Sequence, residues 1–500
     1  MNPQIAKETL DLVKAAQGKP SDDISKSFTQ NGTATSGLTY YDLQAPALNL
    51  FPVITPLRNK TPRIVGGRGI QANWRAITGI NTSNGGIGIS EGNRGVVMAE
   101  TTADYFAKFV GLGMENNLTF EADYAAEGFT DLKAVAARDL MCSVMIGEEK
   151  MMLGGNGSAI ALGTPSTPSV TTAVTGGTIL QTVVCSVICV ALTLDGLNAS
   201  SVANGLPLSA TRTLADGTTE AYNQGTSIQS AAGSATTPTD AITIHSCSAS
   251  VTAIPGAAAY AWFLGTAGNE KLTAITTINS VTMAAPNASG QVATAGFSAD
   301  KSKNALSFDG LLYQAFKSGS GSYVKVMPTG TAGSGTPLTS DSAGGIVEID
   351  ACLQSMWDNY RLSPSCIWVN SQEMQNITKK ILTGSSNAAQ RFVFDAQQGA
   401  LAGGMMVRSY LNKFSMNGAV EIPILLHPNL PAGTILIDTD AIPYPLSGVG
   451  SVKRMLLRRD YYQIEWPLKT RKYEYGVYCD GVLQNYFPPA FGVITNVANG

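Results

Sequence analysis

Residues 130–157 read TDLKAVAARDLMCSVMIGEEKMMLGGNG and carry the strongest helical pattern in the chain. Apolar side chains repeat there at i, i+4 and are broadened by their neighbours: Leu132, Val135, Ala136, Leu140, Cys142, Val144 and Ile146. We expect Thr130 to cap this helix and Asp131 to lie in its first turn, at the positive end of the helix dipole. The Gly154-Gly155 pair is expected to end it. At about 1.5 Å per residue, residues 130–153 predict a rod of roughly 36 Å.

Upstream of this helix, residues 63–120 predict a long two-stranded hairpin. Strand-like sequence occurs at residues 64–65, 74–77, 96–98 and 105–112. Residues 79–95 are rich in Gly, Asn and Ser and predict a flexible tip. Because so long a hairpin is marginal by itself, we expect it to pack on another subunit.

The N-terminal residues predict an arm. Residues 1–20 fit a short amphipathic helix and lack the apolar segment of a signal peptide, which favours folding in a cytoplasm. Residues 20–60 are expected to be extended, because each proline disfavours helix in the residue before it. Apolar side chains such as Leu48 and Phe51 have no local core there, so the arm is expected to lie along a neighbouring surface.

The composition changes sharply between residues 156 and 300, where Arg212 and Lys271 are the basic residues. Apolar runs recur at residues 182–194, 241–244, 260–264 and 272–283, with turn residues between them. This spacing is typical of a β-sandwich, and the linker-like flanks indicate an inserted domain.

Mixed elements follow the insert. Helices are expected at residues 345–360 and 372–382. Strands are expected at residues 366–369, 405–410, 420–426 and 434–438, followed by long β structure over residues 451–480. The fold class predicted from the whole chain is therefore α+β.

Composition limits the function. The charged share is 14%, where a typical globular protein carries about a quarter, and such a low share fits a surface covered by copies of the chain or by a partner. A net charge of −3 argues against general nucleic-acid binding through charge. The longest apolar run, residues 179–194, is too short and too polar to span a membrane. Seven scattered cysteines fit reduced thiols better than disulfides.

The sequence offers little for catalysis, and we expect no catalytic, cofactor-binding or metal site. The two histidines, His245 and His427, lie outside any recognisable nucleophile motif. Cys185 and Cys189 would lie about 13 Å apart on one face of a strand, too far to share one metal ion, so they are expected to be core thiols. The adjacent carboxylates Glu148 and Glu149, followed by Lys150, predict a solvated or intersubunit face.

One region is densely basic: Lys453, Arg454, Arg458, Arg459, Lys469, Arg471 and Lys472. It could contact packaged DNA. No interleaved aromatic pattern accompanies it, so we favour intersubunit salt bridges to acids such as Glu121, Asp123 and Asp131. For Lys453, Arg454, Arg458 and Arg459 the choice between DNA and neighbouring subunits stays open at this point.

The order of elements resembles the major capsid proteins of tailed bacteriophages, the Hong Kong 97 type. The segment from Leu112 to Ser158 is similar to that family's passage from extended loop into spine helix, and the run from Gly154 to Gly157 to its exit. The end of the chain, from Tyr486 through Phe-Pro-Pro-Ala-Phe-Gly, is similar to its closing strands. In the insert, residues 251–262 resemble an immunoglobulin-like strand, turn and strand with Trp262 as core aromatic.

The resemblance implies a division of the chain. The expected parts are an N-terminal arm (1–62), an extended loop (63–120), a peripheral domain with the spine helix (121–158), an inserted immunoglobulin-like β domain (159–303), an axial domain (304–448), and peripheral strands with a C-terminal return to the axial domain (449–500).

The resemblance also implies a function. The chain would be a non-catalytic virion protein that forms pentamers and hexamers and builds an icosahedral head around double-stranded DNA, without sequence-specific binding. A portal, a separate scaffolding protein and a decoration protein are the implied partners. Some family members crosslink through a loop lysine. Between Lys60 and Lys108 this chain has no lysine, so that chemistry is expected to be absent.

Three alternatives remain. A tail tube or sheath protein would also self-assemble but would lack a spine helix after a Gly-rich loop. A surface binding protein with an immunoglobulin-like module predicts a secretion signal. An enzyme with an appended binding domain predicts a convergent polar site.

Overall fold

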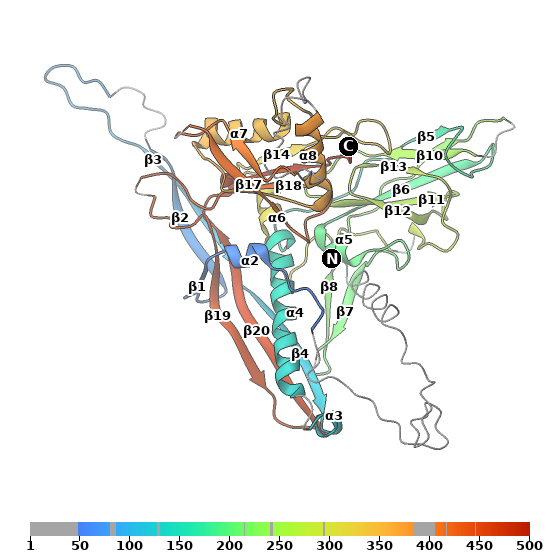
Figure 1. The fold of residues 1–500 in the computed structure, drawn as a ribbon, viewed down its shortest axis with the longest axis horizontal. Coiled ribbons are helices and arrows are strands. Elements are labelled where there is room, and N and C mark those ends of the chain that lie inside the picture. Colours follow the sequence, from blue (N-terminus) through green and yellow to red (C-terminus); the bar gives the residue numbers. More distant parts are fainter. Residues whose placement is uncertain are drawn as a thin grey trace, which may run out of the picture. The chain divides into compact units, whose positions relative to one another are not determined.

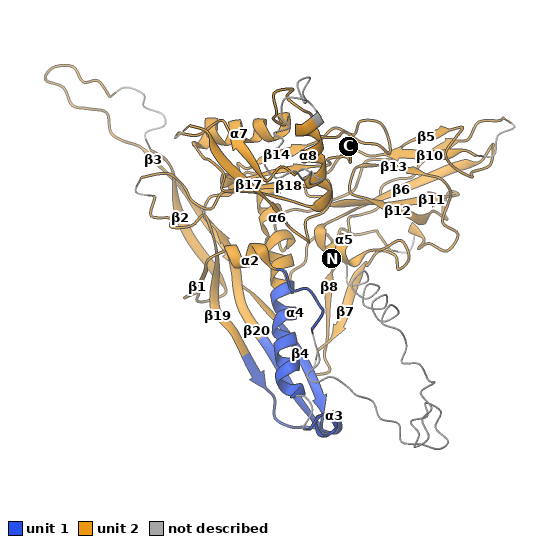
Figure 2. Ribbon diagram, in the orientation of Figure 1, with its two compact units in different colours: residues 1–54, 113–146, 463–477 blue, residues 55–112, 147–462, 478–500 orange. Residues whose placement is uncertain are grey.

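The computed structural model describes residues 49–80, 87–127, 131–214, 216–240, 244–293, 296–383, 406–416, 418–445 and 447–500. The chain is α+β, as the sequence predicts (Figure 1). It divides into two compact units (Figure 2): unit 1 comprises residues 1–54, 113–146 and 463–477, and unit 2 comprises residues 55–112, 147–462 and 478–500. Each unit is described by itself.

The long helix α4 (Leu132–Gly154) follows the short helix α3 (Phe120–Ala125). The side chain of Asp131 accepts a hydrogen bond from the Ala134 backbone N–H at 3.1 Å, so Asp131 caps α4 instead of lying in its first turn. The expected cap, Thr130, lies outside the described residues. Within unit 1, the Lys133 ammonium pairs with Asp123 at 3.0 Å and lies over the Tyr473 ring.

Part of the predicted hairpin is present in unit 2. Residues 63–65 and 110–119, which the prediction included, belong instead to another sheet. Strand β2 (Gln71–Ile80) pairs antiparallel with β3 (Glu100–Lys108), from Gln71 opposite Lys108 to Ile80 opposite Glu100. The expectation of a strand at residues 96–98 is wrong, because these residues have no strand structure and β3 begins only at Glu100. Residues 81–86 of the expected tip lie outside the described residues.

A second sheet has the strand order β1-β19-β20-β4. Its members are β1 (Arg63–Val65), β4 (Val110–Thr119), β19 (Lys453–Glu465) and β20 (Lys472–Asn485). Strand β1 runs parallel to β19, with Arg63 opposite Met455. The long β structure expected over residues 451–480 is therefore a pair of strands that reaches Asn485.

The segment before β1 differs from the extended arm that the sequence predicts. Residues 56–60 form a short helix, α2 (Pro56–Lys60). Proline restricts the residue that precedes it, but its own fixed φ angle suits the first position of a helix. Pro56 therefore begins α2, and the extended prediction fails from that residue onward. Residues 20–48 lie outside the described part of the chain.

The insert contains two sheets, with strand orders β13-β10-β5 and β12-β11-β6-β9. The first is built from β5 (Ser169–Ala173), β10 (Ser246–Ser250) and β13 (Ser280–Met283). The second is built from β6 (Val184–Leu192), β9 (Gly233–Thr236), β11 (Ala259–Gly265) and β12 (Lys271–Thr276). A separate hairpin joins β7 (Ser209–Thr213) to β8 (Thr219–Asn223), and a short helix, α5 (Leu194–Ala199), follows β6.

The two sheets of the insert share one apolar core. Trp262 of β11 is fully buried in it, and its indole N–H donates to the Thr276 hydroxyl at 2.8 Å. Cys185 and Cys189 of β6 lie in the same core, as expected. The opposite face of β6 and β11 is buried too, against a second cluster that includes Phe263 and Phe297. The two-sheet layout agrees with the predicted sandwich, whereas the immunoglobulin-like assignment stays a prediction.

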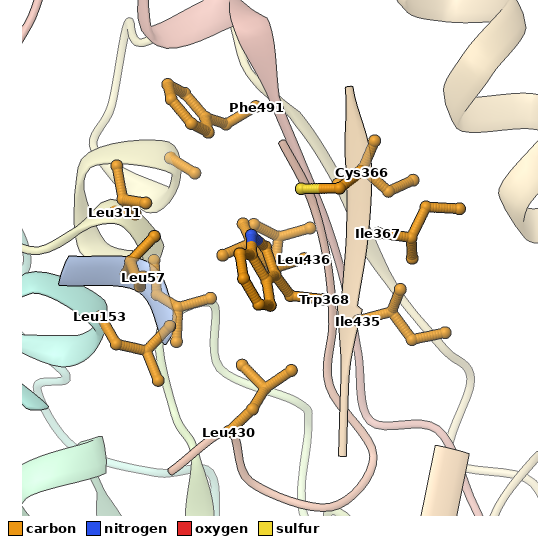
Figure 3. Packing of buried hydrophobic residues seen from close by; sticks show 14 of the residues in the cluster. Leu57, Leu153, Leu311, Cys366, Ile367, Trp368, Leu430, Ile435, Leu436 and Phe491 are labelled. Atoms are coloured by element: carbon orange, nitrogen blue, oxygen red, sulfur yellow. The ribbon is translucent and has the colours of Figure 1, made fainter. Parts of the chain in front are cut away.

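The remaining chain forms a six-stranded sheet in the order β14-β21-β18-β15-β17-β16. Its strands are β14 (Tyr323–Val326), β15 (Cys366–Val369), β16 (Ser409–Asn412), β17 (Val420–Leu426), β18 (Ile435–Asp438) and β21 (Phe491–Thr495). Its helices are α6 (Leu311–Phe316), α7 (Val347–Tyr360), α8 (Ser371–Thr383) and the 3-10 turn η3 (Pro488–Ala490). The large core of unit 2 gathers here around Trp368, Leu436 and Phe491 (Figure 3).

The exit from α4 is too crowded for any residue but glycine. A Cβ on Gly155 would lie 2.3 Å from the Phe308 carbonyl oxygen, and one on Gly157 would lie 2.1 Å from that of Ser307. The Gly310 N–H also donates to the Gly155 carbonyl at 2.8 Å. The predicted role of these glycines as helix exit is therefore confirmed, and close backbone packing is the reason.

We expect Gly155→Ala and Gly157→Ala to destabilise the chain by about 1–3 kcal/mol, because backbone must shift to admit the methyl group. Gly147→Ala is the matched control, since a Cβ there meets nothing within 4 Å. In a helix interior that change should stabilise by about 0.5–1 kcal/mol. Urea unfolding followed by circular dichroism measures both, and equal midpoints for Gly155→Ala and Gly147→Ala would contradict the packing argument.

Candidate assembly surfaces

The β2–β3 hairpin and the residues that follow β2 leave large apolar side chains uncovered. Ile77 is 59% exposed, Ile80 61%, Ile87 91% and Val97 85%. In Figure 1 this segment projects beyond the other strands of unit 2. We call it the apolar hairpin, and its exposed apolar side chains are Ile70, Ile77, Ile80, Ile87, Ile89, Val96, Val97, Met98, Tyr105 and Phe106. Monomeric proteins rarely expose so continuous an apolar stretch, which indicates an interaction surface.

The hairpin is regular in its own right. Trp74 stacks on Tyr105 across the strands, with ring centres 6.0 Å apart. Arg75 and Asp104 face each other and form two hydrogen bonds of 2.6 and 2.8 Å, which lower the pKa of Asp104. Cross-strand pairs of this kind fix the register, so the exposed apolar side chains have defined positions.

Arg458 fixes the base of the hairpin. Its guanidinium lies 5.2 Å from the centre of the Phe109 ring and donates to the Gly69 carbonyl at 3.0 Å. The Phe109 N–H donates to the Ile70 carbonyl at 3.1 Å, which closes the hairpin at its base. Arg458 was a candidate for DNA or neighbouring subunits, but these contacts lie within the chain.

Glu148 and Glu149 are buried, so the expectation that they form a solvated or intersubunit face is wrong. Glu148 is 1% exposed and accepts hydrogen bonds from Arg58 at 2.9 Å, from Arg63 at 2.5 Å and from the Tyr461 hydroxyl. Arg63 also pairs with Asp460 at 2.7 Å. Burial alone would lower the pKa of Arg63, but its hydrogen bond to Asp460 and the charge of Glu148 raise it. This guanidinium therefore stays charged.

Glu149 binds the start of α2. Its carboxylate accepts the backbone N–H groups of Leu57 at 2.9 Å and Arg58 at 2.6 Å. It also contacts Nε2 of His427 at 2.7 Å. The Glu149 carboxylate can only accept a hydrogen bond from Nε2, and the Asn429 N–H donates to Nδ1 of the same ring. Nε2 of His427 therefore carries the proton. The last turns of α4 thus hold the segment that leads into β1 and the hairpin.

Local sequence could not reveal this network, because its cations come from far away in the chain. Adjacent carboxylates at a helix end are usually solvated, and the pairs Arg58–Glu148 and His427–Glu149 span 90 and 278 residues. The available signal was the concentration of Arg58, Lys60 and Arg63 directly after residues 27–57, in which Asp42 is the one charged residue.

The side chains of the densely basic region do not all lie on one exposed face. Lys453 is fully buried and bonds to Asp438 and Asp440. Arg454 donates to Gln484 at 2.9 Å, and the Arg459 guanidinium lies 4.0 Å from the Tyr462 ring centre. Because successive residues of β19 alternate between its faces, a cluster in sequence is split in space.

The acids expected to receive intersubunit salt bridges have partners inside unit 1. Glu121 pairs with Arg471 at 3.0 Å. Asp123 pairs with Lys133, and Asp131 caps α4. These contacts lie within the chain, and intersubunit bridges to the same acids stay a prediction.

Histidine and cysteine side chains are internal. His245 is fully buried, with Nδ1 3.2 Å from the Ile179 carbonyl and Nε2 3.2 Å from Asp240. All seven cysteines are free thiols, and six are buried. Among the described residues no group of three or more His, Cys, Asp or Glu side chains could hold a metal ion. No described helix has the length and apolar character that a membrane span needs.

A second candidate surface lies at the edge of the six-stranded sheet. Strand β16 is its outermost strand beside β17, and apolar side chains of this region stay uncovered: Met406, Leu411, Met416, Val420 and Leu426. An edge strand presents unpaired backbone groups that can bind a partner. This edge combines such groups with exposed apolar area.

No protein-family model matches this sequence, and no curated protein matches it. Solved structures do match. The chain is similar to the capsid of a native GTA particle, with a TM-score of 0.40, 8% identity and coverage of 93% of this chain and 97% of that chain. It is similar to the capsid of the cyanophage P-SCSP1u, with a TM-score of 0.40, 9% identity and coverage of 97% and 99%. For the capsid of Myoviridae phage XM1 the TM-score is 0.39, the identity 8% and the coverage 91% and 97%. Because these likenesses are distant, we base the function on the chain's own surfaces.

We expect Glu148→Gln to destabilise the chain by about 3–5 kcal/mol, because it leaves two largely buried guanidinium groups without their carboxylate. Asp104→Asn is the matched control, since the Arg75–Asp104 pair is exposed and its loss should leave the unfolding midpoint unchanged. Urea unfolding compares the two variants. Equal midpoints would show that the Glu148 network contributes no more than a surface pair.

Proposed function

We propose that this chain is the major capsid protein of a tailed bacteriophage, a structural and non-catalytic virion component. Copies would form pentamers and hexamers and close into an icosahedral head around double-stranded DNA. The observation that carries the proposal is the apolar hairpin. Its two strands pair regularly, and its large apolar side chains are not covered by the rest of the chain.

Assembly would use that surface. Burying apolar area contributes roughly 25 cal/mol per Å², so each uncovered isoleucine favours association with a neighbouring subunit. Closed symmetry repeats every contact many times, so no single contact needs to be strong. The exposed edge at β16 offers a second contact of the same kind. Both surfaces expose apolar area that a partner would cover.

The order of elements supports the same proposal. A hairpin, then a long helix with a glycine exit, then a sheet region and long closing strands is the order that the capsid resemblance implies. The proposal keeps the domain division given above, with residues 159–303 as an immunoglobulin-like insert, and it keeps the absence of catalytic, cofactor and metal sites.

Partners belong to the proposal as well. A separate scaffolding protein and a portal would direct assembly in the host cytoplasm, and a decoration protein could bind the finished head. DNA would be enclosed without base recognition. The hairpin carries no lysine between Lys60 and Lys108, so subunits would be held by noncovalent contacts.

A tail tube or sheath protein and a surface binding protein remain alternative functions. Both would use exposed apolar surface. Neither accounts for a long hairpin whose leading segment is bound by the end of a long helix. The assembled product distinguishes them, because tail proteins form tubes and a binding module stays monomeric.

We expect the double variant Ile77→Ser, Ile80→Ser to fold but to lose assembly, because it removes apolar contact area at the hairpin surface. Thr101→Ser, Thr102→Ser on the facing strand is the control and should assemble like the unchanged chain. Electron microscopy of each chain, expressed with a scaffolding protein, measures shells, and circular dichroism measures folding. Tubes would favour a tail protein. A monomer under every condition would overturn self-assembly, and normal shells from the isoleucine variant would overturn the hairpin's role.

A further inference from the structure

Lys453, at the start of β19, is buried against a carboxylate. Its side chain and that of Asp438, at the end of β18, are both 0% exposed. The Lys453 Nζ atom bonds to both carboxylate oxygens of Asp438. It also lies 2.9 Å from Oδ1 of Asp440. The nitrogen therefore lies directly beside the Asp438 carboxyl carbon, with a second carboxylate within reach.

The surroundings of this pair are apolar and hold it in place. The Phe491 ring centre lies 5.7 Å from Nζ, and the Trp368 indole N–H donates to Oδ2 of Asp438 at 3.0 Å. Figure 3 shows Trp368 and Phe491 within the same core, beside Cys366 and Leu436. Burying two opposite charges costs several kcal/mol per ion, and joining the two groups in a neutral amide would remove that cost.

Asp440 lies nearer the surface than Asp438 and stays ionised. Its side chain is 34% exposed, and Oδ2 pairs with the Lys60 ammonium at 2.8 Å. Burial by itself would raise the pKa of Asp440, but the charges of Lys453 and Lys60 outweigh it and lower that pKa. A carboxylate held in this state can accept a proton from Lys453.

We propose that Lys453 and Asp438 join in an intrachain isopeptide bond. In the proposed step one proton passes from the Lys453 ammonium to Oδ1 of Asp438, the neutral Nζ then attacks the carboxyl carbon, and the Nζ–Cγ bond forms. Asp440 accepts the proton that Nζ loses and passes it to the departing Oδ1 hydroxyl, so the Cγ–Oδ1 bond breaks and one water molecule leaves. Oδ2 remains as the amide oxygen, where the Trp368 N–H donates to it. No oxidant, metal or co-reactant is needed.

The fixed positions of the two groups would accelerate this step. Groups held in near-attack contact react as if present at about 10⁵–10⁸ M, and the buried site keeps bulk water away from the product. The bond closes residues 439–452 into a covalent ring. It ties the six-stranded sheet, through β18, to the sheet that contains β1 and β19. This bond lies within one subunit, so it is separate from any crosslink between subunits.

The full chain, purified and denatured, tests the proposal by intact mass spectrometry. We expect a mass lower by one water molecule than the sequence requires, and the full sequence mass would overturn the bond. A cyclic imide at an aspartate would lose the same water. In the denatured chain, chymotryptic cleavage after Leu446, between the two residues, separates these cases: an isopeptide keeps the fragments joined, and separate fragments would overturn it.

Variants locate the reaction. Lys453→Met and Asp440→Asn should both show no loss of water. Lys413→Met is the matched control, because Lys413 also contacts two carboxylates, those of Asp341 and Asp350, but is 49% exposed. It should keep the water loss of the unchanged chain. Persistent water loss in Asp440→Asn would overturn the role of Asp440, and persistence in Lys453→Met would overturn the proposed bond.

Discussion

Two adjacent buried carboxylates organise the surface on which the proposed function depends. Glu148 and Glu149 lie near the end of α4, and between them they hold Arg58, Arg63 and the first N–H groups of α2. A carboxylate away from water is stable only with such partners, so the network forms as a whole or not at all. The segment that it fixes leads directly into β1 and the apolar hairpin. A hairpin with a loose base would present its apolar side chains in no defined direction, and assembly requires a defined direction.

Apolar side chains are buried in some regions of the chain and exposed in others. In the cluster around Trp368 apolar side chains are covered, and in the insert most of both faces of β6 and β11 is buried. Along the apolar hairpin, side chains of the same kind remain uncovered. Exposed apolar residues occur elsewhere too, such as Leu180 in the insert and Leu468, but the hairpin gathers many of them in one segment. That concentration indicates an interaction surface, and a second copy of the chain is the partner that we propose.

Periodicity in the sequence predicted the elements well where the pattern was local. The strands Cys366–Val369 and Val420–Leu426 begin and end where the sequence places them, and the helix exit at Gly154 is correct. The buried charged residues were harder to predict, because burial of a charged group depends on partners remote in sequence. Glu148 and Lys453 were assigned to surfaces from their charged neighbours along the chain, but each lies beside an opposite charge supplied by another element. The short helix α2 was missed because a rule about residues before proline was extended to the residues after it.

The buried charged residues add a second explanation for the low share of charged residues in the chain. Charged groups make up 14% of the chain, and several of them, including Glu148, Glu149, Asp438 and Lys453, are spent on internal pairs. The outer surface is therefore poorer in charge than the composition alone suggests. Like charges on identical subunits repel each other, and a large net charge opposes close association. A chain with a small charged share and a net charge of −3 meets little repulsion when many copies come together. The internal ion pairs and the low charge of the exterior thus act together: the pairs hold the parts of each subunit in place, and the low charge lets subunits approach one another.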